Sequence, residues 1–251
     1  MKQKSSDVPR AHRASARRRF LAAAVGAYAA ARTDATWAQL GSAGSASLTK
    51  QQRDALSVVQ IIDELKKGNE RFRTGRLVSH DYRDQQRTTA TGQFPAAVVV
   101  GCIDSRAPAE IIFDVGIGDT FNVRIAGNVV NDDILGSLEF ACAVAGAKVV
   151  LVIGHTACGA IKGAIDDVEM GNLTGLLARV KPAITRTQFS GDKSSKNAAY
   201  VDAVARANVV VGIETIRRRS PILEELEKKG SIRILGTMYD LATGVAEMIG
   251  V

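Results

Sequence analysis

Three potential metal ligands follow two short apolar segments of the sequence. Cys102 comes directly after residues 96–101, and His155 and Cys158 follow residues 148–154. Both segments are rich in Val and show no polar alternation, which is typical of central strands covered on both faces of a parallel sheet. Because ligands collect at the carboxyl ends of such strands, placing the two strands side by side would bring the three side chains together. Two thiolates and one imidazole suit Zn²⁺ and leave its fourth coordination position open.

The surrounding sequence predicts the elements that must position these side chains. Strands alternate with helices, which indicates an α/β fold with a mainly parallel central β-sheet flanked by helices. Further strands are predicted at residues 120–125 and 232–238, and helices at residues 132–145, 172–189 and 198–229.

An N-terminal helical arm is predicted to precede the sheet, beginning at Gln51. Apolar residues recur there every three positions, and Gly68 is predicted to end the helix. The recurring apolar positions are Leu56, Val59, Ile62 and Leu65. Residues 76–93 are polar and are predicted to be a loop or a helix.

Residues 1–38 have the order of a secretory signal peptide, with a basic segment, a short Ala-rich apolar stretch and then small residues. Arg17-Arg18 followed by Phe20-Leu21 resembles a twin-arginine export signal. We therefore expect export by the twin-arginine route to the periplasm or to the outside of the cell, with cleavage after Ala38. A disordered basic tail, or a start assigned too early, is the alternative.

The rest of the chain is predicted to be soluble after cleavage. Residues 39–50 are rich in Gly, Ser and Ala and are predicted to be a flexible linker to a domain that spans residues 51–251. No later apolar run is long enough to span a bilayer, so no stable membrane anchor is expected.

Composition and charge exclude several classes of protein. The chain has 251 residues, of which 46% are hydrophobic, enough for one sizeable domain or two small ones and too apolar for a disordered chain. The net charge is +7, but residues 1–38 carry +6 of it and the remainder only +1. Nucleic-acid binding needs a basic face on the folded domain, so no nucleic-acid partner is expected.

The order of the motifs resembles the β-class carbonic anhydrases. The resemblance covers most of the predicted mature chain, and its pieces are specific together although each is weak alone. They are Gly-Asn-x-Arg-Phe at 68–72, Cys-x-Asp-Ser-Arg at 102–106, Gly-Asp-x-Phe-x-x-Arg at 118–124, Ala-Gly-Asn at 126–128, Ser-Leu-Glu-Phe at 137–140, His-x-x-Cys-Gly at 155–159 and Tyr-Asp-x-x-Thr-Gly at 239–244. The resemblance implies a zinc enzyme that hydrates CO₂ reversibly to bicarbonate and a proton through a zinc-bound hydroxide.

Asp104 has two possible roles beside the zinc. Its carboxylate could coordinate the ion and close the fourth position, or Arg106 could hold it in a bidentate pair and leave that position to water. The resemblance assigns Asp104 and Arg106 a catalytic role. It also implies that the Gln93 amide donates to bicarbonate and that Phe121 lines the CO₂ pocket.

The resemblance further implies a homodimer or a higher homo-oligomer with the helical arm packed across its partner. Gln93 and Phe121 would then face the zinc of the neighbouring subunit. Some bacterial members close the site at low pH with bicarbonate held beside a Trp, and Val99 occupies that position here. We therefore expect a site that stays accessible. Ile125 and Phe140 depart from the Asn and Tyr that are frequent in the family.

Other interpretations of the same residues remain open. The zinc site could belong to a carbonyl sulfide or carbon disulfide hydrolase, or to a non-catalytic zinc or thiol sensor. Cys102 and Cys158 could form a disulfide after export. Cys142 is predicted to be a buried thiol on a helix, with a Cys₃His structural site as the alternative. His80 is predicted to be a surface residue rather than a proton shuttle.

Overall fold

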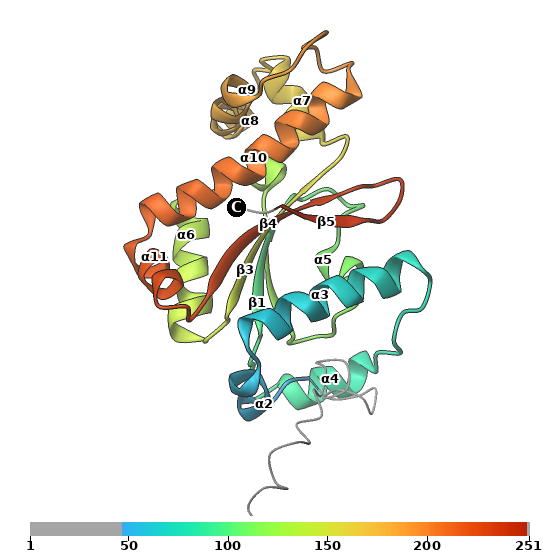
Figure 1. The fold of residues 1–251 in the computed structure, drawn as a ribbon, viewed down its shortest axis with the longest axis vertical. Coiled ribbons are helices and arrows are strands. Elements are labelled where there is room, and N and C mark those ends of the chain that lie inside the picture. Colours follow the sequence, from blue (N-terminus) through green and yellow to red (C-terminus); the bar gives the residue numbers. More distant parts are fainter. Residues whose placement is uncertain (1–46, 250–251) are drawn as a thin grey trace, which may run out of the picture. The chain divides into compact units, whose positions relative to one another are not determined.

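A computed structural model describes residues 47–249 of the chain. The predicted signal peptide and most of the predicted linker lie outside these residues. The described chain builds a five-stranded sheet in the order β2-β1-β3-β4-β5 (Figure 1). The strands are β1 (Ala97–Gly101), β2 (Thr120–Arg124), β3 (Val149–His155), β4 (Arg233–Tyr239) and β5 (Ala246–Ile249). The first four are parallel and β5 is antiparallel to β4, which confirms the predicted mainly parallel sheet.

The two Val-rich segments are neighbours at the centre of this sheet. Every residue of β1 and β3 is buried. Their register pairs Ala97 with Val149 and Val100 with Val152. Because the strands are parallel, their carboxyl ends lie at the same edge, where Cys102 follows β1 and His155 ends β3.

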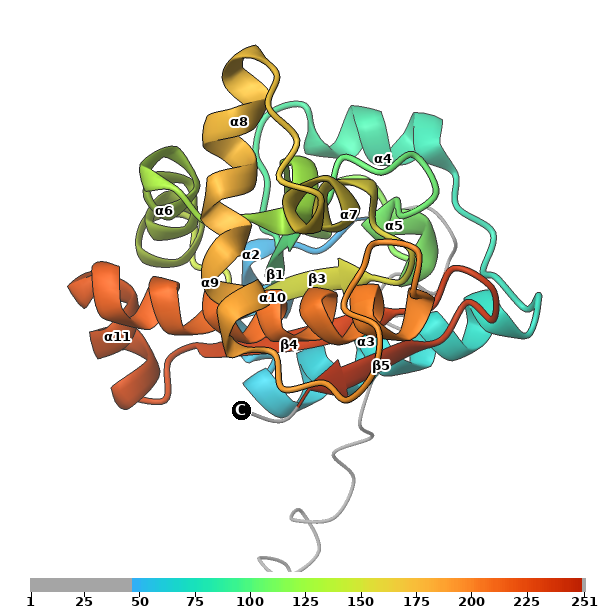
Figure 2. The ribbon, with the colours of Figure 1, turned by 90° about the horizontal axis from the view of Figure 1, so that it is seen from above.

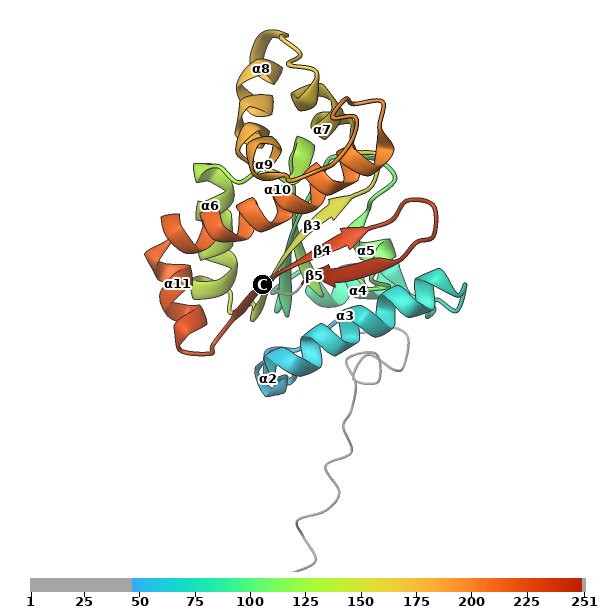
Figure 3. The same cartoon turned by 45° about the horizontal axis from the view of Figure 1, so that its top comes forward.

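Helices cover both faces of the sheet, and alternate strand residues pack against each set. Val98, Val100, Val150 and Val152 pack with α6 (Asp132–Glu139), α10 (Ala198–Arg219) and α11 (Pro221–Lys228). Val99, Val149 and Leu151 pack on the other face with α3 (Val58–Arg73) and α5 (Ala109–Ile112). Figure 3 shows α10 and α3 on opposite sides of β3 and β4.

The predicted helices are present but divided. The helix predicted at 132–145 is α6 followed by a π-helical segment η2 (Phe140–Val144), and Leu135, Leu138 and Cys142 are buried as expected. The region 172–189 holds α8 (Gly171–Leu177), η3 (Ala178–Val180) and α9 (Lys181–Arg186). The region 198–229 divides into α10 and α11 at Ser220, before Pro221.

The remaining elements connect this framework. They are α2 (Lys50–Ala55), α4 (Tyr82–Thr89), η1 (Ala126–Asn128) and α7 (Gly159–Ile165). Figure 2 shows α7, α8 and α9 beside α10. None of the helices within residues 47–249 is long and apolar enough to cross a membrane.

The linker prediction is wrong at its end. Leu48 is buried, and the Thr49 side chain accepts a hydrogen bond from the backbone of Gln52 as the N-cap of α2. An N-cap of this kind satisfies a backbone donor that the first helical turn leaves free. The arm therefore begins at Lys50, and Thr49 is the cap of its first helix rather than part of a linker.

Two details of the predicted arm are also wrong. Residues spaced every three positions drift around a helix of 3.6 residues per turn, so Val59 is 65% exposed while Ile61 and Leu65, four residues apart, are fully buried. Gly68 does not end the helix, since α3 continues to Arg73. A Cβ at Gly68 would lie 1.8 Å from the carbonyl oxygen of Phe113, so this glycine permits close approach of two backbones.

Replacing Gly68 with alanine is expected to destabilise the fold. The clash is with backbone atoms, which cannot rotate away, so we expect a loss of about 2–4 kcal/mol in the free energy of unfolding. Urea denaturation of the zinc-free protein measures this. Gly175→Ala is the matched control, because a Cβ there meets nothing within 4 Å. Equal stability of the two variants would contradict the close-approach argument.

Candidate metal centre

The end of each central strand contributes to one cluster of ligand atoms. Cys102 directly follows β1, His155 is the last residue of β3, and Cys158 is the N-cap of α7. One ligand atom from each lies within 4.8 Å of the others, and all three side chains are buried. The two sulfur atoms are 4.0 Å apart. The fold therefore brings together the three residues whose spacing suggested a metal site.

The imidazole of His155 is oriented for coordination. Its Nδ1 lies 2.9 Å from the carbonyl oxygen of Thr156. A carbonyl only accepts, so Nδ1 carries the proton and Nε2 presents a lone pair. Nε2 is buried and has no hydrogen-bond partner among the described residues. An orphaned buried nitrogen beside two sulfur atoms fits a metal ion, because buried polar atoms are otherwise almost always paired.

The two thiols also need a cation to ionise together. The hydrogen bond from Cys158 is the largest cause that lowers the pKa of Cys102 to about 4, and the Gly127 N–H, 3.3 Å from the sulfur, lowers it further. The same contact raises the pKa of Cys158. The pair on its own thus holds one proton. A bound divalent ion is what allows both sulfur atoms to be thiolates, and the set of two sulfurs and one nitrogen suits Zn²⁺.

Asp104 is held by Arg106 rather than turned to the ligand cluster. Its Oδ1 accepts from the Arg106 Nε at 2.9 Å and from the Arg106 backbone N–H at 3.0 Å. Its Oδ2 accepts from Nη2 at 2.8 Å. This bidentate contact holds the pKa of the Asp104 carboxyl well below its usual range. Oδ2 is 3.8 Å from the His155 Nε2, so the carboxylate borders the cluster. Of the two predicted arrangements of Asp104, the structure has the one in which Arg106 holds the carboxylate in a bidentate pair.

Two supporting groups were not predicted from the sequence. Arg124, at the end of β2, donates to the backbone carbonyls of Cys102 and Asp104 and so fixes the loop between them. The Gly127 N–H donates to the Cys102 sulfur. Both residues belong to motifs that carry the family resemblance, but the motifs do not state which atoms they contact.

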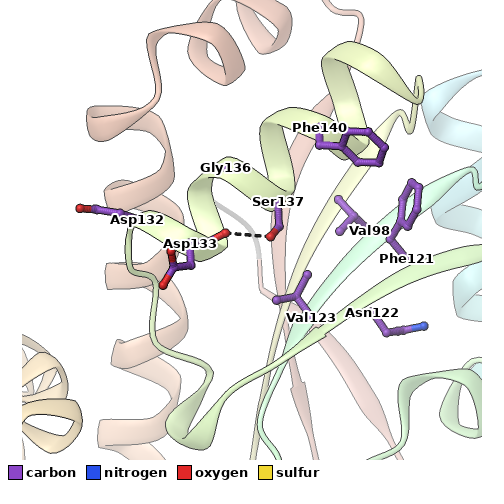
Figure 4. Close-up of a pocket in the computed structure, with 9 residues that line it drawn as sticks. All are labelled: Val98, Phe121, Asn122, Val123, Asp132, Asp133, Gly136, Ser137 and Phe140. Atoms are coloured by element: carbon purple, nitrogen blue, oxygen red, sulfur yellow. Dashed lines mark hydrogen bonds between the residues drawn. The ribbon is translucent and has the colours of Figure 1, made fainter.

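Within one chain, Phe121 and Gln93 are not brought to the ligand cluster. Phe121 pairs in register with Val98, which precedes Cys102 by a strand length of about 13 Å. Its ring packs edge-on against Phe140, with centroids 6.1 Å apart. Both rings line a pocket of about 650 Å³ between β2 and α6 (Figure 4), and none of the three ligand residues lines it. Gln93 is exposed in the loop before β1.

Cys142 and His80 lie outside the cluster. Cys142 lies on η2 and is buried in the core, where burial raises the pKa of its thiol to about 12. It is not among the grouped ligand atoms. The prediction of a surface His80 is wrong, because its side chain is only 13% exposed. Its ring nitrogens contact Asp114 at 3.1 Å and Gln85 at 3.3 Å. These contacts fix the segment between α3 and α4 against the residues that follow α5.

The fold and the cluster together define an α/β protein with a Cys-His-Cys site, compatible with zinc, at the carboxyl edge of a parallel sheet. A sequence profile described as "Carbonic anhydrase" matches residues 97–246. The chain belongs to the β-class carbonic anhydrases and is a carbonic anhydrase enzyme.

Individual relatives agree with this assignment. The chain is 38% identical over 188 residues to carbonic anhydrase 2 of Mycobacterium tuberculosis, covering 72% of this chain and 88% of that protein. It is 35% identical over 186 residues to a carbonic anhydrase of Mycolicibacterium smegmatis, covering 73% and 89%. Among solved structures, a tetrameric β-carbonic anhydrase of Sordaria macrospora superposes with a TM-score of 0.59 at 26% identity, covering 64% of this chain and 84% of that one.

Proposed function

We propose that this protein is a zinc enzyme that hydrates CO₂ reversibly to bicarbonate and a proton. The observation that carries the proposal is the buried, unpartnered Nε2 of His155 beside the sulfur atoms of Cys102 and Cys158. These three residues would hold the zinc. When bound, the ion lowers the pKa of a coordinated water to about 7 and so supplies a nucleophile at neutral pH.

Asp104 and Arg106 supply the remaining chemistry from this chain. The Arg106 guanidinium donates to both carboxylate oxygens of Asp104, which holds the carboxylate beside the cluster and leaves it further lone pairs with which to accept. The lowered pKa of Asp104 keeps it ionised through the neutral range. The Asp104 carboxylate would then accept a hydrogen bond from the attacking oxygen, and this contact would orient a lone pair of that oxygen toward CO₂.

The direct test is stopped-flow measurement of CO₂ hydration by the zinc-loaded protein, together with its metal content. We expect about one zinc per chain and a kcat/KM between about 10⁴ and 10⁸ M⁻¹ s⁻¹. Carbonyl sulfide and carbon disulfide are assayed in parallel. If either sulfur compound is turned over faster than CO₂, that compound is the substrate and the proposal of CO₂ hydration is wrong. Bound zinc without turnover of any of the three compounds would indicate a sensor.

The zinc coordination is expected to stay the same from about pH 6.5 to about pH 8.5, because Val99 stands where some family members hold bicarbonate beside a Trp, and because the ionised Asp104 carboxylate does not change charge in this range. A carboxyl with a depressed pKa loses its ion pair only when the pH falls toward that pKa, so the Asp104–Arg106 pair persists. X-ray absorption spectroscopy across this range measures the ligand set. Coordination of zinc by Asp104 below about pH 7.5, lost when bicarbonate is removed, would contradict the expectation.

The substrate pocket is proposed to lie between subunits of a homo-oligomer, where Gln93 and Phe121 of one chain face the zinc of the next. The separation of Phe121 from the cluster within one chain supports this, as does the 52% exposure of Phe140 beside it. The Sordaria macrospora relative is described as tetrameric. Mixing Cys158→Ser subunits with Phe121→Ala subunits tests the arrangement, since a mixed dimer regains one intact site and its activity exceeds the sum of the parents. No gain in mixed oligomers would place each site within one chain.

The sequence of residues 1–38 supports the proposal that the protein is exported. The exported part would be the zinc-dependent domain in residues 51–251. The twin-arginine route carries folded proteins, so the zinc could be loaded before export and protect both thiolates from oxidation. Fractionation of cells that produce the full chain, compared with an Arg17→Lys/Arg18→Lys variant, tests the route. The wild type should reach the periplasm or the medium, and the variant should stay in the cytoplasm. Equal export of both would exclude the twin-arginine route.

A further inference from the structure

One peptide group joins the candidate metal ligand His155 to an acidic residue on α10. The carbonyl of Thr156 accepts from the His155 Nδ1 at 2.9 Å. The N–H of the same peptide group, which belongs to Ala157, donates to the Asp202 Oδ1 at 2.9 Å. A single planar amide therefore lies between a carboxylate and the imidazole, with a hydrogen bond at each end.

The packing of α10 against the end of β3 makes this contact possible. Gly154 directly precedes His155, and a Cβ there would lie 2.6 Å from the Val209 side chain and 3.5 Å from the Ala205 carbonyl. The missing side chain lets α10 pass close to the strand end. Asp202 lies on α10 beside the buried Val201 and is itself only partly exposed.

The backbone at this contact adopts a conformation that needs support. Ala157 has a φ of 54°, in the left-handed region that residues with a Cβ rarely adopt. It lies between His155 and Cys158, so its conformation sets the relative direction of two of the three ligands. The carboxylate of Asp202 is the partner of its N–H.

The same helix also supports the other ligand loop. Asn208, buried on α10, donates through Nδ2 to the Gly127 carbonyl at 2.8 Å. Gly127 in turn donates its N–H to the Cys102 sulfur. The position of α10 along the sheet is thus fixed relative to both strand ends, which allows Asp202 to act at a defined atom.

We propose that Asp202 is a positioning residue of the metal site, which acts through the Thr156–Ala157 peptide group to orient His155 and to hold its proton on Nδ1. A carboxylate that accepts from an amide N–H polarises the amide and makes its carbonyl a stronger acceptor. The stronger acceptor favours the tautomer with a proton on Nδ1 and a lone pair on Nε2. Carboxylates commonly support metal-bound histidines by direct contact. Here a peptide group stands between them.

This inference rests on the proposed zinc site, but it also makes a prediction for the zinc-free protein. The chain contains three histidines, so selective ¹⁵N-histidine labelling resolves the His155 ring by NMR. In the zinc-free wild type, at a pH where the His155 ring is neutral, we expect the Nδ1–H tautomer to dominate. In Asp202→Ala we expect a mixture of tautomers. An unchanged tautomer in Asp202→Ala would overturn the proposal, whether or not the wild type binds zinc, whereas a wild type without zinc would overturn only the proposed function.

Zinc affinity, measured by competition with a chromogenic chelator, is the second readout. Loss of an outer partner of a metal-bound histidine typically weakens metal binding by about 10- to 100-fold, and we expect a weakening in this range for Asp202→Ala. Asp202→Asn keeps an acceptor oxygen without the charge, so its zinc affinity should lie between those of Asp202→Ala and the wild type. This variant replaces Asp202→Ala in the test if the alanine variant does not fold. Glu214→Ala is the matched control, because it removes a carboxylate of α10 that pairs with Arg186 at the surface. Equal affinity in all four proteins would overturn the proposal.

A further variant separates this role from simple support of the strained backbone. Ala157→Gly removes the conformational penalty at a positive φ. If Asp202 acts on His155 through the peptide group, Asp202→Ala still weakens zinc binding by a similar factor in the Ala157→Gly background. If the weakening disappears in that background, Asp202 serves only the loop, and the proposed effect on His155 is wrong.

Discussion

Replacing Cys158 with serine is expected to abolish both zinc binding and CO₂ hydration. The serine hydroxyl is not deprotonated at neutral pH and is a poor ligand for Zn²⁺ beside a thiolate and an imidazole. Cys158 is buried at the N-cap of α7, and none of the described carboxylates or imidazoles joins the cluster to replace it. The site would be left with two ligands from this chain.

The expected loss of kcat/KM in Cys158→Ser is about a thousandfold or more, because the acidity of the nucleophilic water comes from the ion. Metal analysis and stopped-flow hydration of the purified full chain measure the two effects together. Cys142→Ala is the matched control, since it removes a buried thiol that lies in the core away from the cluster. It should keep its zinc and its turnover. Full zinc occupancy in Cys158→Ser would disprove the assigned ligand set.

Replacing Asp104 with asparagine is expected to remove most of the activity while the zinc stays bound. The variant keeps the size of the side chain but loses the negative charge that Arg106 holds with two side-chain hydrogen bonds. An amide can offer an N–H where the carboxylate only accepts, so the nucleophile loses a reliable acceptor. Positioned groups of this kind typically contribute about 10²- to 10⁴-fold to the rate, and we expect a fall in kcat within that range.

The contrast between metal content and turnover distinguishes Asp104→Asn from Cys158→Ser. Asp63→Asn provides the matched control, because it neutralises a half-exposed carboxylate on α3 whose ion-pair partner is Lys66. Unchanged turnover in Asp104→Asn would mean that Asp104 and Arg106 form only a surface ion pair. Loss of zinc in the same variant would instead make Asp104 part of the metal-holding shell.

Local sequence patterns were sufficient to predict the ligand set and the strands that carry it. The Val-rich segments before Cys102 and His155 have no polar face, so they fit only positions covered on both sides. Because the two strands are parallel, the residues that follow each strand lie at the same edge of the sheet. Asp104 and Arg106 are two positions apart in the chain. Their contact therefore forms within the short loop after β1 and needs no distant part of the chain.

The end of the sheet was not predicted because its local signal is weak. β5 has four residues, and its side chains are partly or fully exposed. It is held by antiparallel pairing with β4, which a local pattern of residues does not specify. Phe121 shows a related limit, since the resemblance suggested a role near zinc but a single chain places it beside Phe140.

Tertiary structure alone decided which distant groups support the site. Asp202 reaches the Ala157 N–H across 45 positions of the chain, and Asn208 reaches Gly127 across 81. The sequence determined the candidate ligands and the strands, because those depend on neighbours along the chain. The groups that contact the candidate ligand loops depend on how α10 packs against the finished sheet, and that packing is set by shape and burial across the whole domain.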